Sequence, residues 1–196
     1  VQNSNTDASV SITDKFEINS SGALIINEGS TFASAGNDFN HNNGTIINNG
    51  TFEINGDEIF TPSNFTIPGN TRAVGSVLSI DDLTLENIEF NPSNGLLTLT
   101  DDIDYILGNI TLAEGDSFDM DIYDLSLADG RTVTNYGTWL APKSGSRFTC
   151  KGNATFTGDD MNFSEFYAVS EDSDTIIFRG GNTYTITDHL TINGNM

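Results

Sequence analysis

Residues 43–54 read NGTIINNGTFEI, two short runs of β-branched and aromatic residues separated by Asn-Asn-Gly. Runs of this length are typical of β-strands, and Gly and Asn accept the positive φ values of tight turns between them. Helical periodicity is almost absent, and only residues 164–168 would accommodate a turn of helix. The same punctuation extends outward from this segment, because glycines recur every six to eight residues in two parts of the chain: Gly22, Gly29, Gly36, Gly44, Gly50, Gly56, and Gly130, Gly137, Gly145, Gly152, Gly158. The sequence therefore predicts an all-β fold.

The segment that begins at Gly22 resembles the one that begins at Gly44, an offset of 22 residues. Three strands of about five residues, joined at Gly or Asn corners, would fill a coil of roughly this length, within the ~20–45 residues of solenoid repeats. A single coil cannot bury its inward face alone, so successive coils must stack on a shared core. We therefore expect a β-solenoid, that is a parallel β-helix, with ladders of side-chain amides at four corner asparagines: Asn27, Asn48, Asn49 and Asn55.

A longer repeat is superimposed on the coils. Three related segments start 87 residues apart, namely ITDKFEI at residue 12, LTDDIDY at residue 99 and ITDHLTI at residue 186. The intervals between them align with few gaps, least well where residues 70–86 meet residues 159–174. This spacing predicts a continuous solenoid with four parts: a leading junction over 1–11, repeat A over 12–98, repeat B over 99–185 and the start of a third repeat over 186–196.

A tandem pair of β-sandwich modules is the alternative fold. An 87-residue period suits an immunoglobulin-like domain, which has ~100 residues and turn signals every ~8–12 residues. The glycine spacing of six to eight residues is tighter than that, and it favours the solenoid.

Composition and charge exclude several classes of partner. The 196 residues include 7 Lys and Arg against 28 Asp and Glu, a net charge of −21, so the basic footprint that nucleic acid or an anionic membrane demands is missing. Apolar runs are only a few residues long, which argues against membrane insertion. The single cysteine, Cys150, cannot form an internal disulfide. Because the chain starts at Val1 without an apolar signal segment, we expect a processed secreted protein or an excised fragment, located outside the cell or on its surface.

Residues 43–52 (NGTIINNGTF) and 185–194 (TITDHLTING) resemble the repeats of two groups of extracellular proteins. These are the pectin-lyase-like right-handed parallel β-helices and the filamentous-haemagglutinin-like adhesins of microbial surfaces. The resemblance is one of style and contains no family-specific motif. It implies a secreted structural or adhesive β-helix, and it assigns no functional residue.

Catalysis is not expected from the chemically active side chains. His41 and His189 lie at predicted strand edges, and Cys150 has no histidine near it in the sequence, so it is expected to be a packed thiol. A polysaccharide-active enzyme on a β-helix remains the most distant alternative. It would need clustered bases to meet uronate carboxylates, and only three bases lie close together: Lys143, Arg147 and Lys151.

No cofactor is expected, although four clustered acidic residues could in principle bind Ca²⁺, which takes ~6–8 oxygen ligands. Neither the nonapeptide calcium repeat nor an EF-hand loop accompanies them, so a solvated acidic face is favoured over a metal site. The four are Asp116, Asp119, Asp121 and Asp124.

Seven asparagines precede x-Ser or x-Thr and are candidates for glycosylation. Asn64 and Asn153 occupy equivalent places in the two 87-residue repeats, which favours them over the others. The remaining five are Asn19, Asn43, Asn49, Asn109 and Asn162.

The two ends of the chain carry the functional hypothesis. An open solenoid end exposes unpaired backbone and apolar core, and neither end shows a capping helix or a proline block. We therefore expect a non-enzymatic fibre subunit that binds other copies of itself head to tail, with glycans as further partners. The alternative is a stalk or carbohydrate-binding fragment of a larger adhesin. Six apolar residues are predicted to mediate the end contacts: Ile12, Phe16, Ile18, Ile186, Leu190 and Ile192.

Overall fold

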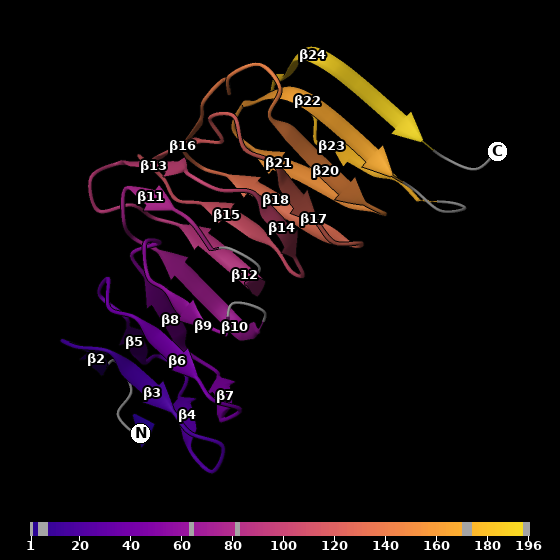
Figure 1. Ribbon diagram of the computed structural model, residues 1–196. Coiled ribbons are helices and arrows are strands. Elements are labelled where there is room, and N and C mark those ends of the chain that lie inside the picture. Colours follow the sequence, from indigo (N-terminus) through magenta and orange to yellow (C-terminus); the bar gives the residue numbers. More distant parts are fainter. Residues whose placement is uncertain (1, 4–7, 63–64, 81–82, 170–173, 194–196) are drawn as a thin grey trace.

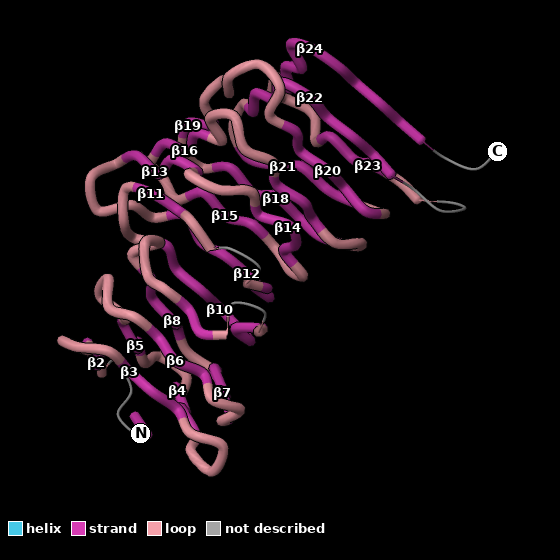
Figure 2. Tube along the Cα trace, viewed as in Figure 1, coloured by secondary structure: helices cyan, strands magenta, loops and turns pink. Residues whose placement is uncertain are grey.

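The computed structural model in Figure 1 describes residues 2–3, 8–62, 65–80, 83–169 and 174–193. Every strand pairing within these ranges is parallel, and they contain strands and loops but no helix (Figure 2). Tandem immunoglobulin-like sandwiches would be built from antiparallel sheets. The β-solenoid prediction is therefore confirmed, and the β-sandwich alternative is wrong.

Each coil contains three strand positions, and the chain passes through them in the same order from the indigo to the yellow end of Figure 1. The first position, which we call the first face, is formed by β2 (Ser9–Ser11), β5 (Thr31–Ala33), β8 (Thr51–Ile54), the C-terminal halves of β10 (Thr66–Ala73) and β12 (Thr84–Phe90), β15 (Ile110–Leu112), β18 (Arg131–Asn135), β21 (Ala154–Gly158) and β23 (Ile176–Phe178).

The second position is formed by β3 (Phe16–Ile18), β6 (Phe39–His41), β9 (Phe60–Thr61), β11 (Val77–Leu78), β13 (Leu96–Leu99), β16 (Ser117–Asp119), β19 (Thr138–Trp139) and the N-terminal parts of β22 (Met161–Val169) and β24 (Tyr184–Asn193). The third is formed by β1 (Gln2–Asn3), β4 (Ala23–Ile26), β7 (Thr45–Asn48), the N-terminal halves of β10 and β12, β14 (Ile103–Ile106), β17 (Leu125–Leu127), β20 (Arg147–Lys151) and the C-terminal parts of β22 and β24.

One column of stacked residues on the first face gives the number of turns and the length of each coil. Nine strands contribute to it, so the chain makes about eight turns: Val10, Phe32, Phe52, Thr71, Ile88, Ile110, Val133, Phe156 and Phe178. The shortest coil runs from Thr71 to Ile88, and the longest ones run from Ile110 to Val133 and from there to Phe156. At ~4.8 Å per strand step, eight turns extend over about 40 Å.

The 87-residue repeat is not expressed as equivalent strand positions throughout the solenoid. Phe52 and Trp139 lie 87 residues apart, yet Phe52 belongs to β8 on the first face and Trp139 belongs to β19 at the second position. Because the coils differ in length, a fixed sequence period drifts around the coil. The division into repeats A and B stays a prediction.

Aromatic rings pack against one another along most of the core, and smaller side chains replace them in one coil. Phe32, Phe39 and Phe52 pack together near the N-terminus, with ring centroids 5.4 to 6.4 Å apart. The coil that begins at β10 instead buries Thr71 and Ala73. This coil is the short one, so small inward residues match a narrower cross-section.

Residues 164–168, where the sequence would allow a turn of helix, belong to β22 instead. Phe166 and Ala168 point into the core opposite Phe148 and Cys150, so period-two alternation decides the conformation.

The corners are held by side chains of Asn and Asp that accept backbone N–H groups of the next coil. Asn87 Oδ1 accepts from Asn109 N at 2.9 Å, and Asn109 Oδ1 accepts from Thr132 N at 2.9 Å. Asn48, one of the predicted ladder residues, donates its Nδ2 to the carbonyl oxygens of Pro68 and Asn70. At Asn48, Asn87 and Asn109 these hydrogen bonds run from side chain to backbone. The amide ladder at Asn27, Asn49 and Asn55 stays a prediction.

Candidate functional site

The C-terminal end of the solenoid presents a strand edge. β24 pairs with β22 on one side, and within the described ranges no strand pairs with its other side. Figure 1 shows β24 as the outermost yellow arrow, at the end of the stack. An exposed edge of ten residues is a template for pairing with another strand.

Apolar side chains accompany this edge, and we call them the C-terminal apolar face: Phe178, Ile186, Leu190 and Ile192. Leu190 and Ile192 are 56% and 70% exposed. They continue the inward columns of Phe166 and Ala168, which are buried in the preceding coil. The face is thus a cross-section of the core that another coil would cover.

The N-terminal end is less open. Ile12 and Phe16 are half-buried, and the ring of Phe16 lies 5.0 Å from that of Phe32. Ile18 is only 3% exposed, so it packs within its own chain instead of facing an open end. β1 also adds a partial strand beside β4. The two ends therefore differ, and the predicted contact residues are most accessible at the C-terminal end.

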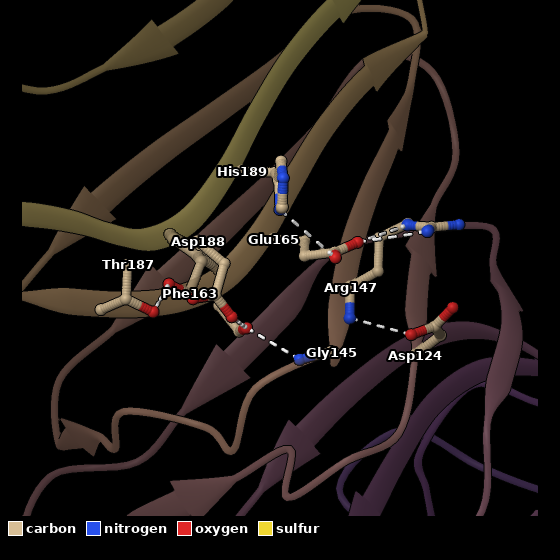
Figure 3. A network of polar contacts seen from close by, with 9 residues as sticks. Asp124, Gly145, Arg147, Phe163, Glu165, Thr187, Asp188 and His189 are labelled. Atoms are coloured by element: carbon tan, nitrogen blue, oxygen red, sulfur yellow. Dashed lines mark hydrogen bonds and ion pairs between the residues drawn. The ribbon is translucent and has the colours of Figure 1, made fainter.

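A polar network lies beside the C-terminal apolar face (Figure 3). The Glu165 carboxylate lies between the Arg147 guanidinium and the His189 imidazole, 3.1 Å from Arg147 Nη2 and 3.7 Å from His189 Nδ1. The hydrogen bond from Arg147 to Glu165 raises the pKa of the guanidinium. Asp124 accepts Arg147 N at 2.8 Å, while burial raises the pKa of the Asp124 carboxyl. The column ties β24 to the three preceding coils.

Ser164 and Asp188 form the second part of this network. Ser164 Oγ donates to Asp188 Oδ2 at 2.6 Å and accepts from Gly145 N at 3.1 Å. Hydrogen bonds from Ser164 and Ser144 lower the pKa of Asp188. Because Ser164 is buried and donates to a carboxylate, the pair anchors β24 rather than presenting a nucleophile.

The remaining reactive side chains are engaged in packing. His41 Nε2 lies 2.8 Å from Gly44 O, and its ring stacks on Phe65 at 4.8 Å. Cys150 is fully buried, and burial raises the pKa of its thiol to about 12. A thiol in this state is a packed residue, as the sequence suggested.

The cluster of three bases is distributed over separate partners. Lys143 Nζ lies 2.6 Å from Asp121 Oδ1, and this contact raises the pKa of Lys143. The guanidinium carbon of Arg147 lies 4.2 Å from the centre of the Tyr167 ring, and Lys151 Nζ lies 4.5 Å from that of Tyr105. The cluster therefore does not converge on a single anion site.

The four candidate calcium ligands are likewise separated. Asp121 is paired with Lys143, and Asp124 accepts the amide of Arg147. The Asp119 carboxylate accepts a hydrogen bond from the backbone N–H of Asp121. Burial, and secondly the negative charge of Glu89, raise the pKa of Asp116. In the part of the chain that the structure describes, no group of three or more His, Cys, Asp or Glu side chains is placed to hold a metal ion.

The glycosylation candidates fall into two groups. Asn153 Nδ2 donates to the carboxylates of Asp129 and Asp174, and Asn162 Nδ2 donates to Trp139 O at 2.7 Å. Asn64 lies outside the described residues. Because a glycan attaches to the amide nitrogen, the geometry favours the four candidates that are exposed: Asn19, Asn43, Asn49 and Asn109.

A groove on the outside of the first face was not indicated by the sequence. It has a volume of about 570 Å³, and we call it the first-face groove. Arg72 lies on its floor between two carboxylates, with Nε 2.9 Å from Glu89 and Nη1 3.9 Å from Glu53. The rest of its polar lining consists of Thr51, Asn70, Thr71, Asn87, Glu89, Asn109 and Thr111.

These features define the class of the protein as a parallel β-solenoid with an open, apolar C-terminal end and a polar groove on its side. Comparison of the chain with protein-family models, with curated proteins and with solved structures gave no match. Over the described residues, no helix is long and apolar enough to span a membrane.

Proposed function

We propose that the chain is a structural subunit that assembles head to tail, the C-terminal apolar face of one copy covering the N-terminal coil of the next. The N-terminal coil comprises β1, β2 and β3, the outermost described strands of the three positions at that end. The observation that carries the proposal is β24, whose free backbone edge and exposed Leu190 and Ile192 extend the core columns outward. Pairing along this edge would bury both the backbone groups and the apolar side chains.

Such a contact joins two different surfaces, so it is heterologous and leaves both ends of every oligomer open. Heterologous contacts that do not close into a ring produce filaments. The net charge of −21 per subunit opposes side-by-side association of such filaments. We also propose a location outside the cell or on its surface, supported by the exposed sequons and the resemblance to extracellular repeat proteins.

Sedimentation velocity over a range of protein concentrations tests the assembly. We expect the wild-type chain to form larger species as concentration rises, and more readily in salt, because salt screens the repulsion between acidic subunits. The double variant Leu190→Lys with Ile192→Lys should remain monomeric.

Ile59→Lys with Ile122→Lys is the matched control. Both residues are exposed, at 64% and 55%, yet lie away from the C-terminal apolar face. This control should assemble like the wild type. A wild-type chain that stays monomeric at all concentrations, or equal loss of assembly in both double variants, would contradict the proposal.

A further inference from the structure

The first-face groove is built by four successive coils. Outward residues of β8, β10 and β12 form two columns, which β15 and the residue before it extend. One column contains Thr51, Asn70, Asn87 and Asn109, and the other contains Glu53, Arg72, Glu89 and Thr111. Strand geometry places the coils ~4.8 Å apart and neighbouring columns about 6.6 Å apart. The groove therefore offers a grid of polar groups that extends about 14 Å along the solenoid axis.

The centre of the groove carries one guanidinium and two carboxylates, so its net charge is only −1. Arg72 is flanked by Glu53 and Glu89, so its positive charge is neutralised there. A polyanion would meet two carboxylates for each guanidinium, on a protein with a net charge of −21. A simple cation would be repelled by the Arg72 guanidinium, which already lies between those two carboxylates. Charge therefore favours a neutral ligand.

The lining favours a ligand that binds through hydrogen bonds over one that binds through apolar contacts. Ile88, the one large apolar side chain on the lining, is buried beneath it. Asparagine amides and threonine hydroxyls both donate and accept, Glu89 accepts, and Arg72 donates. A second groove of about 340 Å³ adjoins the first at Asn87 and adds Glu86 and Arg131. A long ligand with many hydroxyl groups would satisfy this grid, whereas a compact apolar ligand would not.

We propose that the first-face groove binds a neutral oligosaccharide, laid along the solenoid axis across β8, β10, β12 and β15. Successive sugar hydroxyls bond to the side chains of Thr51, Asn70 and Thr111, and a vicinal diol bridges Arg72 and Glu89. The site lies on the side of the solenoid, away from the C-terminal apolar face. It goes beyond the proposed assembly and does not depend on it.

Calorimetric titration of the 196-residue chain with cellotetraose, maltotetraose, xylotetraose and mannotetraose tests the proposal, with tetragalacturonate as the charged counterpart. We expect at least one neutral tetrasaccharide to bind in the micromolar to millimolar range and the uronate to bind more weakly. Thr111→Val removes one lining hydroxyl at constant shape, and it should weaken binding roughly three- to tenfold, as for one lost hydrogen bond.

Thr134→Val is the matched control, because Thr134 is the next residue in the same column and lies outside the groove lining. It should leave the affinity unchanged. The proposal would be overturned if none of the four neutral tetrasaccharides bound at millimolar concentration. It would also be overturned by tighter binding of the uronate, or by equal effects of Thr111→Val and Thr134→Val.

Discussion

At the scale of single residues, two buried polar side chains, Thr71 and Glu58, are expected to affect the stability of the fold in opposite directions. Thr71 points into the core between Phe52 and Ile88, and its Oγ1 has no hydrogen-bond partner among the described residues. Glu58 is also buried, at 5% exposed, but its carboxylate accepts from the hydroxyl of Ser34 and from three backbone amides. The Thr71 hydroxyl is therefore desolvated without a compensating hydrogen bond. The Glu58 carboxylate instead stabilises a corner through its hydrogen bonds.

Replacing Thr71 by Val should stabilise the protein by about 1–2 kcal/mol, because the variant keeps the shape of the side chain and removes an unsatisfied hydroxyl. Urea denaturation gives the free energy of unfolding. Thr134→Val, on the solvated side of the first face, should change it little. A Thr71→Val variant less stable than the wild type would indicate that the hydroxyl has a bonding role.

Glu58→Gln should destabilise the protein by about 2–3 kcal/mol, since an amide group would turn an N–H toward donors that the carboxylate now satisfies. The three backbone donors are Gly36 N at 3.2 Å and Asn55 N and Gly56 N, both at 2.6 Å. Glu114→Gln, at an exposed site, is the control. Equal stability of the two variants would contradict a structural role for the buried carboxylate.

At the scale of the secondary structure, the sequence predicted most where Gly and Asn delimit short apolar runs. The runs around residues 45–48 and 51–54 are β7 and β8, as expected. It predicted least around residues 70–86, because the strands β10 and β12 run through a corner and the coil between Thr71 and Ile88 is the shortest. No local sequence pattern predicts a corner through which a strand continues without interruption.

The first-face groove could not be predicted for a related reason. Its charged centre joins Glu53, Arg72 and Glu89, and the step from Glu53 to Arg72 is longer in sequence than the step from Arg72 to Glu89. These unequal intervals align only when the length of each coil is known. The end residues were easier to find, since Leu190 and Ile192 follow the apolar alternation of the strand to which they belong.

The last strand should loosen in acid. Hydrogen bonds from Ser164 and Ser144 hold the pKa of Asp188 below its ordinary value of 3.8. A lowered pKa means that the ionised carboxylate favours the folded state. Its contribution is therefore complete above the unfolded-state pKa and is lost as the pH falls through the folded-state pKa. Asp188→Asn should thus lower the free energy of unfolding at neutral pH, and the difference from wild type should vanish in acid.

The stability difference between Asp124→Asn and wild type should change with pH in the opposite direction to that of Asp188→Asn. Burial raises the pKa of Asp124, so protonation of this group in acid favours the folded state. Urea denaturation of both variants from about pH 7 down to about pH 2 follows these titrations. A stability difference for Asp188→Asn that is constant with pH would contradict the role given to the Ser164–Asp188 bond.

At the scale of the whole molecule, the two ends and the sides have different properties. The C-terminal end exposes core side chains and a free strand edge, whereas the N-terminal coil is half-covered by its own residues. The sides are polar and acidic, and they carry the first-face groove. A solenoid built in this way would add copies along its axis while leaving its sides free for saccharide binding.

Electron microscopy of the undenatured chain, imaged at increasing concentration, tests the head-to-tail proposal most directly. We predict unbranched filaments of single-solenoid width with an axial repeat of about 40 Å, the length of eight stacked coils. Isolated particles at every concentration, or assemblies that grow laterally instead of along the axis, would contradict it.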